Sequence, residues 1–292
     1  MAEPITFFHV GYARAASTFL QKTVFPALTG LQYIPRNNFR VRESEKRRFN
    51  KNKVLMSREA GEYIFDRCDK VWEVFESKMI VSVRRHDKLA ESTYRLYAKN
   101  GYTFRFPEFL DVKDDKGVRK IKDWTYLNVL EHAEELTGSK PLLLIFEDYI
   151  NDPDFYIDSL CAYLQCNIDR SKLSDKVVHK SYSDKQLRLR RQFSQRFLSP
   201  EESWRRLVNA DLENYTPWKN LKDKILVRIS GLFMRLARFI PDSFLDEEPL
   251  LDSNHSKAIK EFFAPDWNAC FDYVEKQSEL LGVQRNKEVS WK

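Results

Sequence analysis

Short apolar runs alternate with amphipathic stretches along the first half of the chain. The segments between the runs place apolar residues three or four positions apart, which is the spacing of one helix face. Strands that alternate with helices are typical of a parallel sheet with right-handed crossovers. The pattern therefore predicts an α/β fold, with a central parallel sheet flanked by helices. The predicted strands are Ile5–Val10, Val54–Ser57, Met79–Arg84 and Leu142–Glu147, and the predicted helices are Phe19–Leu28, Ala60–Phe75, Lys88–Lys99 and Tyr126–Leu136.

Beyond about residue 153 the pattern predicts helices alone. The length of 292 residues suits one domain. We expect a single domain over residues 1–292, in which residues 1–165 form the α/β core and residues 166–292 form a mainly helical C-terminal part. The helices predicted in this second half are Phe155–Leu164, Asp184–Phe197, Pro200–Leu212, Leu221–Phe239 and His255–Leu281.

The composition excludes several classes of protein. With 42% hydrophobic residues the chain can bury a core, which excludes intrinsic disorder. The net charge of +6 is spread over basic and acidic residues that alternate along the chain, so no nucleic-acid partner is predicted. The sequence has neither a secretory signal pattern nor an apolar stretch of about 18 residues, so we expect a soluble, cytoplasmic protein.

The cysteines are scattered along the chain and are not spaced like metal ligands. No metal site is therefore predicted. We expect all of them to be buried, reduced thiols. They are Cys68, Cys161, Cys166 and Cys270.

The first predicted strand leads into a loop of small residues and a helix that opens with two hydroxyl side chains, over Gly11–Thr18. Small residues let the backbone wrap around an anion, and the first helical turn offers free N–H groups and a favourable dipole. In a Walker A loop, G-x-x-x-x-G-K-S/T, the lysine would stand at Ser17, so it is missing here, and a cation lies at Arg14 instead. The loop is predicted to bind an anion other than a nucleoside triphosphate. The alternative is an ordinary strand-to-helix turn with Ser17 as the N-cap.

A second candidate anion site follows the strand predicted over Met79–Arg84. Arg84 stands at the end of that strand, and Ser92 follows eight residues later on the next predicted helix. A guanidinium can hold a phosphate through two hydrogen bonds. Because ligands of parallel sheets bind beyond the carboxyl ends of the strands, both candidate sites are expected at the same edge. The alternative is that Arg84 is a surface cation and Ser92 a hydroxyl on a helix face.

Together the two segments resemble the sulfotransferases that use 3′-phosphoadenosine 5′-phosphosulfate (PAPS) as sulfuryl donor and release 3′,5′-ADP. The first signature of that family is a strand followed by a basic residue, two small or hydroxyl residues and two hydroxyl residues. Arg14–Thr18 matches it, with alanine at position 15 where a hydroxyl is usual and at position 16 where glycine is commoner. The second signature is an arginine at a strand end with a serine eight residues later, as in Arg84 and Ser92. The match covers residues 5–165 and is most similar to bacterial members.

The resemblance implies a P-loop-like sulfotransferase fold and a role for each matching residue. Arg14 would bind the phosphosulfate and stabilise charge on the leaving phosphate. Arg84 and Ser92 would hold the 3′-phosphate of the donor. The residues around the 5′-phosphate would be Ala15, Ala16, Ser17, Thr18 and Phe19.

The acceptor hydroxyl needs a base, and two residues near strand ends are candidates. Ser57-Arg58-Glu59 resembles an S-x-E found in bacterial members after this strand, so Glu59 is the preferred base. His86 is the other candidate, although it follows the 3′-phosphate arginine. The alternative for Glu59 is a carboxylate placed favourably at a helix N-terminus. His9, within the first strand, is expected to be a core histidine.

By analogy with bacterial relatives, the acceptor is expected to be a saccharide or glycolipid hydroxyl. Basic residues alternate with apolar ones over Leu221–Phe239, so this segment either contacts an anionic membrane surface or packs its apolar stripe on the fold. Two other functions stay open: a P-loop kinase of a small molecule, and a nucleotide-binding scaffold without catalytic activity.

Overall fold

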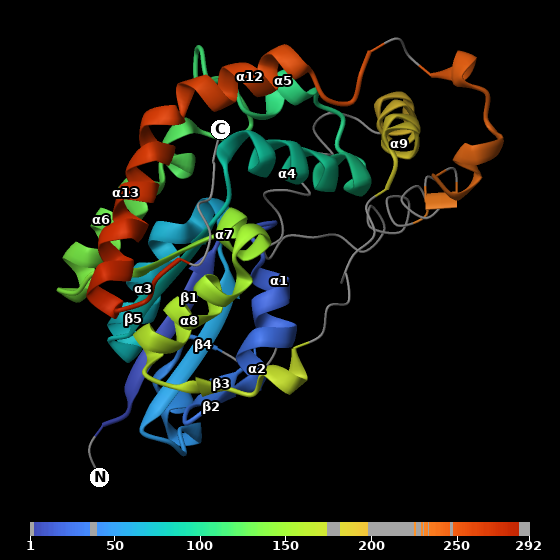
Figure 1. Cartoon of the computed structure of the whole chain (residues 1–292). Coiled ribbons are helices and arrows are strands. Elements are labelled where there is room, and N and C mark those ends of the chain that lie inside the picture. The colour runs from blue at the N-terminus through green and yellow to red at the C-terminus, as the bar shows by residue number, and fades with distance from the viewer. Residues whose placement is uncertain are drawn as a thin grey trace. The chain divides into compact units, whose positions relative to one another are not determined.

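The computed structural model describes residues 3–35, 40–173, 182–197, 225, 229, 231–232, 234–245 and 248–285. The chain forms two compact units that interleave along the sequence (Figure 1). The first unit comprises Met1–Leu89, Ile121–Val178 and Lys260–Lys292. The second comprises Ala90–Lys120 and His179–Ile259. The sequence predicts one boundary within the domain, at residue 165. The two units do not follow this boundary, because each contains segments from both sides of it.

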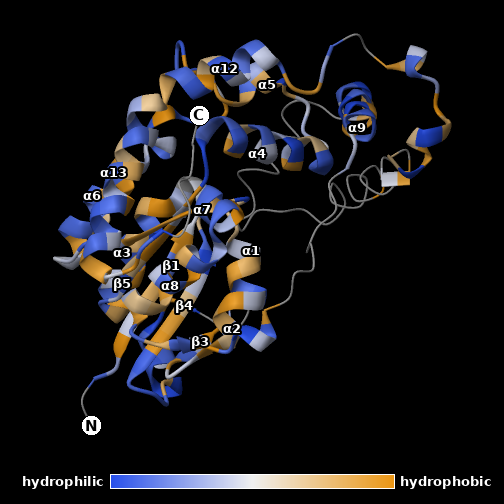
Figure 2. Cartoon of the chain, in the orientation of Figure 1, coloured by the Kyte–Doolittle hydropathy of each residue, from blue (hydrophilic) through white to orange (hydrophobic). Residues whose placement is uncertain are grey.

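The first unit contains a five-stranded sheet in which every neighbouring pair of strands is parallel. Figure 2 shows hydrophobic residues concentrated on the central strands. The predicted α/β class with a central parallel sheet is confirmed. In spatial order the strands are β3 (Gln32–Ile34), β4 (Lys53–Glu59), β1 (Ile5–Gly11), β5 (Lys78–Val83) and β6 (Leu142–Ile145).

The strand order places the loop after β1 at the point where the chain reverses direction across the sheet. The chain builds β3 and β4 on one side of β1 and then crosses to build β5 and β6 on the other. In open parallel sheets, ligands bind at the carboxyl ends of the strands beside such a switch point. The topology therefore makes the loop after β1 the first place to look for a site.

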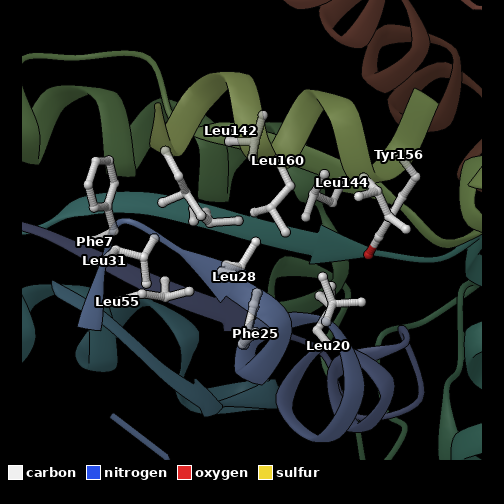
Figure 3. Close-up of a cluster of buried hydrophobic side chains, with 14 residues drawn as sticks. Phe7, Leu20, Phe25, Leu28, Leu31, Leu55, Leu142, Leu144, Tyr156 and Leu160 are labelled. Atoms are coloured by element: carbon white, nitrogen blue, oxygen red, sulfur yellow. The ribbon is translucent and has the colours of Figure 1, made fainter. Parts of the chain in front are cut away.

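One face of the sheet is covered by the helical segment after β1 and by α8 (Pro153–Leu164), which enclose a cluster of buried apolar side chains (Figure 3). The segment after β1 consists of α1 (Ser17–Phe19), the π-helical turn η1 (Leu20–Val24) and α2 (Phe25–Ala27). Each fully buried leucine or phenylalanine contributes about 1.5–3 kcal/mol through removal of its surface from water. The cluster comprises Phe7, Leu20, Val24, Phe25, Leu28, Leu31, Leu55, Ile80, Leu142, Leu144, Tyr156, Ile157, Leu160 and Leu164.

The opposite face is covered by α3 (Ile64–Phe75), α6 (Tyr126–Thr137) and α13 (Ala264–Leu281). Side chains alternate between the faces along β1, so Phe7 lies on the first face and Thr6 on the second. The Thr6 hydroxyl accordingly donates to the carbonyl of Phe75 at the end of α3, at 2.7 Å. The predicted strand–helix alternation thus yields a three-layered unit.

Several element boundaries differ from the sequence prediction. The prediction omits β3, which has only three residues, two of them half-buried. It extends β6 to Glu147, but the strand ends at Ile145 and α7 (Phe146–Asn151) follows at once. It joins α12 (Ser253–Phe262) and α13 into one helix, whereas the structure begins a new helix at Ala264, with Pro265 in its first turn.

The remaining helices agree with the prediction where the structure describes them. The helices α4 (His86–Asn100) and α9 (Asp184–Phe197) correspond to predicted segments, and α9 has the predicted bounds. The helix predicted over Pro200–Leu212 lies outside the described residues. The short elements are α5 (Phe106–Phe109), the pair β2 (Leu28–Thr29) and β7 (Asn167–Ile168), and the 3-10 helices Glu43–Arg48, Gly61–Tyr63, Ile121–Trp124, Arg170–Lys172, Ala237–Phe239 and Asp242–Phe244.

The second unit is built around a buried arginine and a group of aromatic rings. The guanidinium of Arg191 donates to the Tyr94 hydroxyl at 3.3 Å and lies 3.6 Å from the carboxylate of Glu248. The Tyr94 ring packs on Phe106 and Phe109. Burial of a charge is tolerated here because the guanidinium finds hydrogen-bond partners on several sides.

The cysteines only partly follow the prediction. All are free thiols, as expected, and Cys68 and Cys270 are completely buried. The prediction of burial is wrong for Cys161 and Cys166, which are half-buried where α8 ends. Within the described residues, no group of three His, Cys, Asp or Glu side chains could hold a metal ion. No helix in the described part of the chain is long and apolar enough to cross a membrane.

Candidate functional site

The loop after β1 leaves the sheet between β4 and β5. In the strand register, Gly11 lies opposite Glu59 of β4 on one side and Ser82 of β5 on the other. The N–H of Ala60 donates to the carbonyl of Gly11 at 3.2 Å, and the N–H of Tyr12 donates to that of Ser82 at 3.3 Å. These bonds fix the start of the loop to both neighbouring strands.

The loop adopts a backbone conformation that is unusual for non-glycine residues. Arg14 has φ 77° and Ala16 has φ 64°, both in the left-handed region. The N–H of Ala15 donates to the carbonyl of Tyr12 at 3.2 Å, which closes a tight turn. Alternation of left- and right-handed residues directs neighbouring N–H groups towards one point and forms a concavity that binds anions. The side chain of Arg14 is exposed and that of Ala15 is buried.

Ser17 directs its side chain into the protein. Its hydroxyl donates to the Tyr12 carbonyl at 3.4 Å and lies 3.4 Å from the Ser82 hydroxyl. Thr18 and Phe19 are half-buried, and the Phe19 ring packs against Tyr149 with 4.4 Å between centroids. The direct roles predicted for Ser17, Thr18 and Phe19 around the 5′-phosphate stay predictions.

Gly11 is expected to be intolerant of a side chain. A Cβ there would lie 3.1 Å from the Ser82 carbonyl oxygen and 3.2 Å from the Ser17 hydroxyl, and would overlap the Ser82 hydroxyl. We expect Gly11→Ala to lower the free energy of unfolding by about 1–3 kcal/mol, because an added methyl group between tightly packed strands forces the backbone to shift. Urea unfolding measures the change. Gly231→Ala is the control, since the described residues place no atom within 4 Å of its Cβ position; equal stability of the two variants would contradict the prediction.

Arg84 reaches back from the end of β5 to this loop. Its Nη1 donates to the carbonyl of Arg14 at 3.3 Å. Its guanidinium lies over the Phe146 ring at 4.6 Å, and its own carbonyl accepts from the Tyr126 hydroxyl at 2.6 Å. The two arginines that sequence analysis singled out are therefore brought together at one edge of the sheet, although they are 70 positions apart in the sequence.

The turn that carries Arg84 is held by carboxylates. Glu147 accepts from the backbone N–H of Arg85 at 3.1 Å, and Asp87 accepts two hydrogen bonds from the Arg85 guanidinium at 2.7 and 2.9 Å. Burial raises the pKa of Glu147, while the Arg85 N–H and the charges of Arg84 and Arg85 oppose the rise. Asp148 accepts from Arg285 at 2.9 Å. Glu147 thus orients the turn that carries Arg84.

Glu59 ends β4 directly beside the loop. Alternation along the strand puts it on the same face as Ser57. The Ser57 hydroxyl accepts from the Gln21 amide at 2.9 Å, so this is the face that the helix after β1 covers. Glu59 therefore lies on the loop side of the sheet, opposite Gly11 in the register. Its role as base stays a prediction.

His86, the other candidate base, is enclosed in the fold. Its Nε2 lies 2.9 Å from the Trp124 carbonyl and 3.1 Å from a carboxylate oxygen of Asp266. Its ring is stacked between Tyr126 and Phe263, at 4.1 and 4.3 Å between centroids, and is 1% exposed. A ring so enclosed ties α4 to α6 and α13, and it is poorly placed to take a proton from an acceptor.

His9 is a core histidine, as the sequence predicts. Its two ring nitrogens hydrogen-bond with the hydroxyls of Ser57 and Ser82, at 2.8 and 3.0 Å. The side chain is fully buried, and the loss of hydration lowers its pKa to about 3. The histidine is therefore neutral in the folded protein at neutral pH.

The burial of His9 predicts a dependence of stability on acid. Between pH 6.5 and 3 the unfolded chain binds a proton at this residue that the folded chain does not, so stability falls as the pH falls. The contribution of His9 to the slope approaches about 1.4 kcal/mol per pH unit. We expect His9→Gln to remove this contribution from urea unfolding measured at pH 7, 6, 5 and 4. A slope identical to that of the unsubstituted protein would contradict the prediction.

Two aromatic residues of the site were missed by sequence reasoning. Tyr126 binds the Arg84 carbonyl, and Tyr12 donates to the carbonyl of Asp123 at 2.7 Å. Tyr12 lies within the loop motif, which could have drawn attention to it. Nothing in the local pattern marks Tyr126. Ser92 lies on α4 in the part that belongs to the second unit, and its predicted role at the 3′-phosphate stays a prediction.

Comparison with known proteins finds similarity in structure only. No protein-family model and no curated protein matches the sequence. The crystal structure of a sulfotransferase from Alicyclobacillus acidocaldarius is 16% identical, with a TM-score of 0.44 over 73% of this chain and 98% of that one. The crystal structure of mouse sulfotransferase SULT7A1 complexed with PAP is 13% identical, with a TM-score of 0.46 over 94% of this chain and 90% of that one. The chain is thus distantly similar in structure to bacterial and mouse sulfotransferases.

Proposed function

We propose that the protein is a PAPS-dependent sulfotransferase that transfers a sulfuryl group to an acceptor hydroxyl and releases 3′,5′-ADP. The observation that carries the proposal is the hydrogen bond from the Arg84 guanidinium to the carbonyl of Arg14. Through it, the two arginines of the sulfotransferase-like motifs meet at the carboxyl edge of the sheet, beside a loop with an anion-binding backbone conformation.

The residues at this edge fit a ligand with two anionic ends. The loop offers the backbone N–H groups of Ala16 and Ser17 and the exposed cation of Arg14. Arg84 offers a guanidinium that packs over the Phe146 ring. The donor would supply an activated sulfur whose bond to a phosphate oxygen breaks during transfer. Arg14 would stabilise the charge that develops on that oxygen, and because a guanidinium stays protonated it would do so electrostatically.

Glu59 is the proposed base. Its position at the end of β4, opposite Gly11, puts a carboxylate beside the loop. When the acceptor oxygen attacks sulfur, its proton would pass to this carboxylate. Glu59→Gln keeps the shape of the side chain and removes the base, so it is expected to lower the rate of transfer without changing the affinity for 3′,5′-ADP.

The acceptor is proposed to be a saccharide or glycolipid hydroxyl, and the compartment the cytoplasm. The free thiols fit a reducing compartment. A glycolipid acceptor would require access to a membrane surface, and the C-terminal half offers a segment suited to it.

Part of the segment Leu221–Phe239 exposes an apolar stripe. The structure describes Ile225, Ile229, Gly231–Leu232 and Met234–Phe239 of it, and the other positions lie outside the described residues. Ile225, Ile229, Leu232 and Leu236 recur at helical spacing and are between 40% and 55% exposed. On the opposite side, Met234 and Ala237 are buried. The exposed fractions of these four residues support the first alternative from the sequence, contact with a membrane surface.

We propose that this stripe contacts an anionic membrane surface, because the segment also carries Arg235 and Arg238, both exposed. Flotation with liposomes tests the contact. We expect the protein to float with vesicles that contain phosphatidylglycerol and not with neutral phosphatidylcholine vesicles, and Leu232→Glu to abolish flotation. No binding to anionic vesicles, or a dimer through the stripe in sedimentation, would overturn the proposal.

Thermal stabilisation by nucleotides tests the main proposal. Ligand at 100 times its dissociation constant stabilises a protein by about 2.7 kcal/mol. We expect 3′,5′-ADP to raise the melting temperature more than ATP or 5′-AMP, since it alone carries both the 3′- and the 5′-phosphate. Preferential stabilisation by ATP would favour a kinase. Binding of 3′,5′-ADP without sulfuryl transfer from PAPS to any saccharide or glycolipid would favour a scaffold.

A further inference from the structure

The C-terminus of α8 is closed by a motif that brings two cysteines together. Gln165 has φ 48°, its N–H donates to the carbonyl of Ala162 at 3.1 Å, and the N–H of Cys166 donates to that of Cys161 at 3.0 Å. This pair of bonds around a left-handed residue is the Schellman motif. In that motif the side chains that here belong to Cys161 and Cys166 commonly make an apolar contact with each other.

In this protein both contact positions are cysteines, and their side chains interact with each other. Both thiols are half-buried and pack partly against the core cluster. The other two cysteines, Cys68 and Cys270, are completely buried. The motif therefore creates an accessible pair, separate from the candidate active site.

A lysine lies at the same helix end. Lys53, the first residue of β4, donates from Nζ to the carbonyl of Gln165 at 2.6 Å and approaches that of Leu164 at 3.4 Å. The hydrogen bond from Cys161 and the positive charge of Lys53 lower the pKa of Cys166, against the effect of burial. The thiolate is the reactive form of cysteine, so the lysine bound to the Gln165 carbonyl favours Cys166, the next residue, as the nucleophile of the pair.

We propose that Cys161 and Cys166 form a redox-active dithiol that is oxidised to a disulfide by hydrogen peroxide. The thiolate of Cys166 attacks one peroxide oxygen, the O–O bond breaks, and hydroxide leaves, so that Cys166 becomes a sulfenic acid. The sulfur of Cys161 then attacks the Cys166 sulfur, the S–S bond forms, and the hydroxyl leaves as water with the proton of Cys161. Hydrogen peroxide is thus reduced to one hydroxide and one water, and a thiol reductant reverses the oxidation by exchange.

The bond would form within a helix end that is already closed by the hydrogen bond between the same two residues. Oxidation is therefore expected to leave α8 and the sheet unchanged. The strand β7 begins at Asn167, the next residue, and pairs with β2 directly after α2. A small shift of the backbone at Cys166 on disulfide formation would therefore affect the pairing of β7 with β2 before other parts of the fold.

Mass spectrometry of the full-length protein tests the proposal. One tryptic peptide, which ends at Arg170, contains both Cys161 and Cys166 and neither of the other cysteines. After treatment with hydrogen peroxide and alkylation, we expect this peptide to lose the mass of two hydrogens and to take up no alkylating reagent. Cys68 and Cys270 are expected to stay reduced, and to be alkylated only after the protein is unfolded.

Variants separate the roles of the two cysteines. In Cys161→Ser, Cys166 has no resolving thiol, so a sulfenic acid is expected to accumulate and to be trapped by dimedone. In Cys166→Ser, Cys161 is expected to react severalfold more slowly. Lys53→Gln is expected to slow oxidation severalfold at pH 7, while far-ultraviolet circular dichroism stays unchanged. Absence of the disulfide in the folded protein, or oxidation of Cys68 and Cys270 at the same rate, would overturn the proposal.

Discussion

Replacing Arg14 by alanine is expected to slow sulfuryl transfer by about 10²–10³-fold, the usual effect of removing one group that stabilises developing charge. The guanidinium is exposed at the loop after β1, and its charge is the one that the proposed mechanism places beside the leaving phosphate oxygen. Initial rates with PAPS and the acceptor, at saturating concentrations, measure the effect. Arg47→Ala is the matched control, because Arg47 is an exposed arginine of the same unit in a 3-10 helix that contributes nothing to the loop.

A glycine variant separates charge from backbone at the same position. Arg14 has φ 77°, and a left-handed conformation costs a residue with a Cβ about 1–2 kcal/mol that glycine does not lose. Arg14→Gly is therefore expected to unfold at a higher urea concentration than Arg14→Ala and to be equally slow. Normal turnover in either variant would contradict the role of the charge. Recovery of activity in the glycine variant alone would show that the backbone, and not the guanidinium, limits the reaction.

The parts of the site that sequence could predict are those with a local cause. A loop of small residues and the start of a helix with hydroxyl residues follow the first strand over Gly11–Thr18. The loop can therefore be recognised from the local sequence, without knowledge of any distant contact. The meeting of Arg14 and Arg84 could also be predicted, because carboxyl ends of parallel strands share one edge. In the structure the Arg84 guanidinium donates to the backbone carbonyl of Arg14 at 3.3 Å, and the roles of the two side chains toward a donor stay predictions.

What the sequence could not show depends on packing between distant elements. The hydroxyl of Tyr126 and the ring of Phe146 both position Arg84. The hydrophobic pattern of their segments predicts that the two residues are buried, but not that they contact Arg84. β3 was missed because three residues are too few for a periodic signal. The prediction that Cys161 and Cys166 are buried failed because a helix-closing motif holds them at the surface of the core.

The strongest test of the donor site compares two nucleotides on one arginine variant. If Arg84 holds the 3′-phosphate, Arg84→Ala removes charged hydrogen bonds worth about 1.5–3 kcal/mol, which corresponds to a rise of roughly 10- to 150-fold in the dissociation constant of 3′,5′-ADP. The affinity for 5′-AMP, which lacks that phosphate, is then expected to change much less. Calorimetric titration of both nucleotides, with Arg47→Ala alongside, measures the difference.

The comparison has a second use, because Arg84 also supports the loop through its bond to the Arg14 carbonyl. If support of the loop were the whole role of Arg84, the variant would weaken 3′,5′-ADP and 5′-AMP by the same factor, since both place a 5′-phosphate in the loop. Arg84→Lys sharpens the distinction, because it keeps a positive charge but loses the planar fork that holds a phosphate at two points. A lysine that restores 5′-AMP affinity but not the preference for 3′,5′-ADP would assign the 3′-phosphate to the guanidinium. Equal losses for both nucleotides in both variants would instead make Arg84 a structural residue of the loop and remove the 3′-phosphate site from this edge of the sheet.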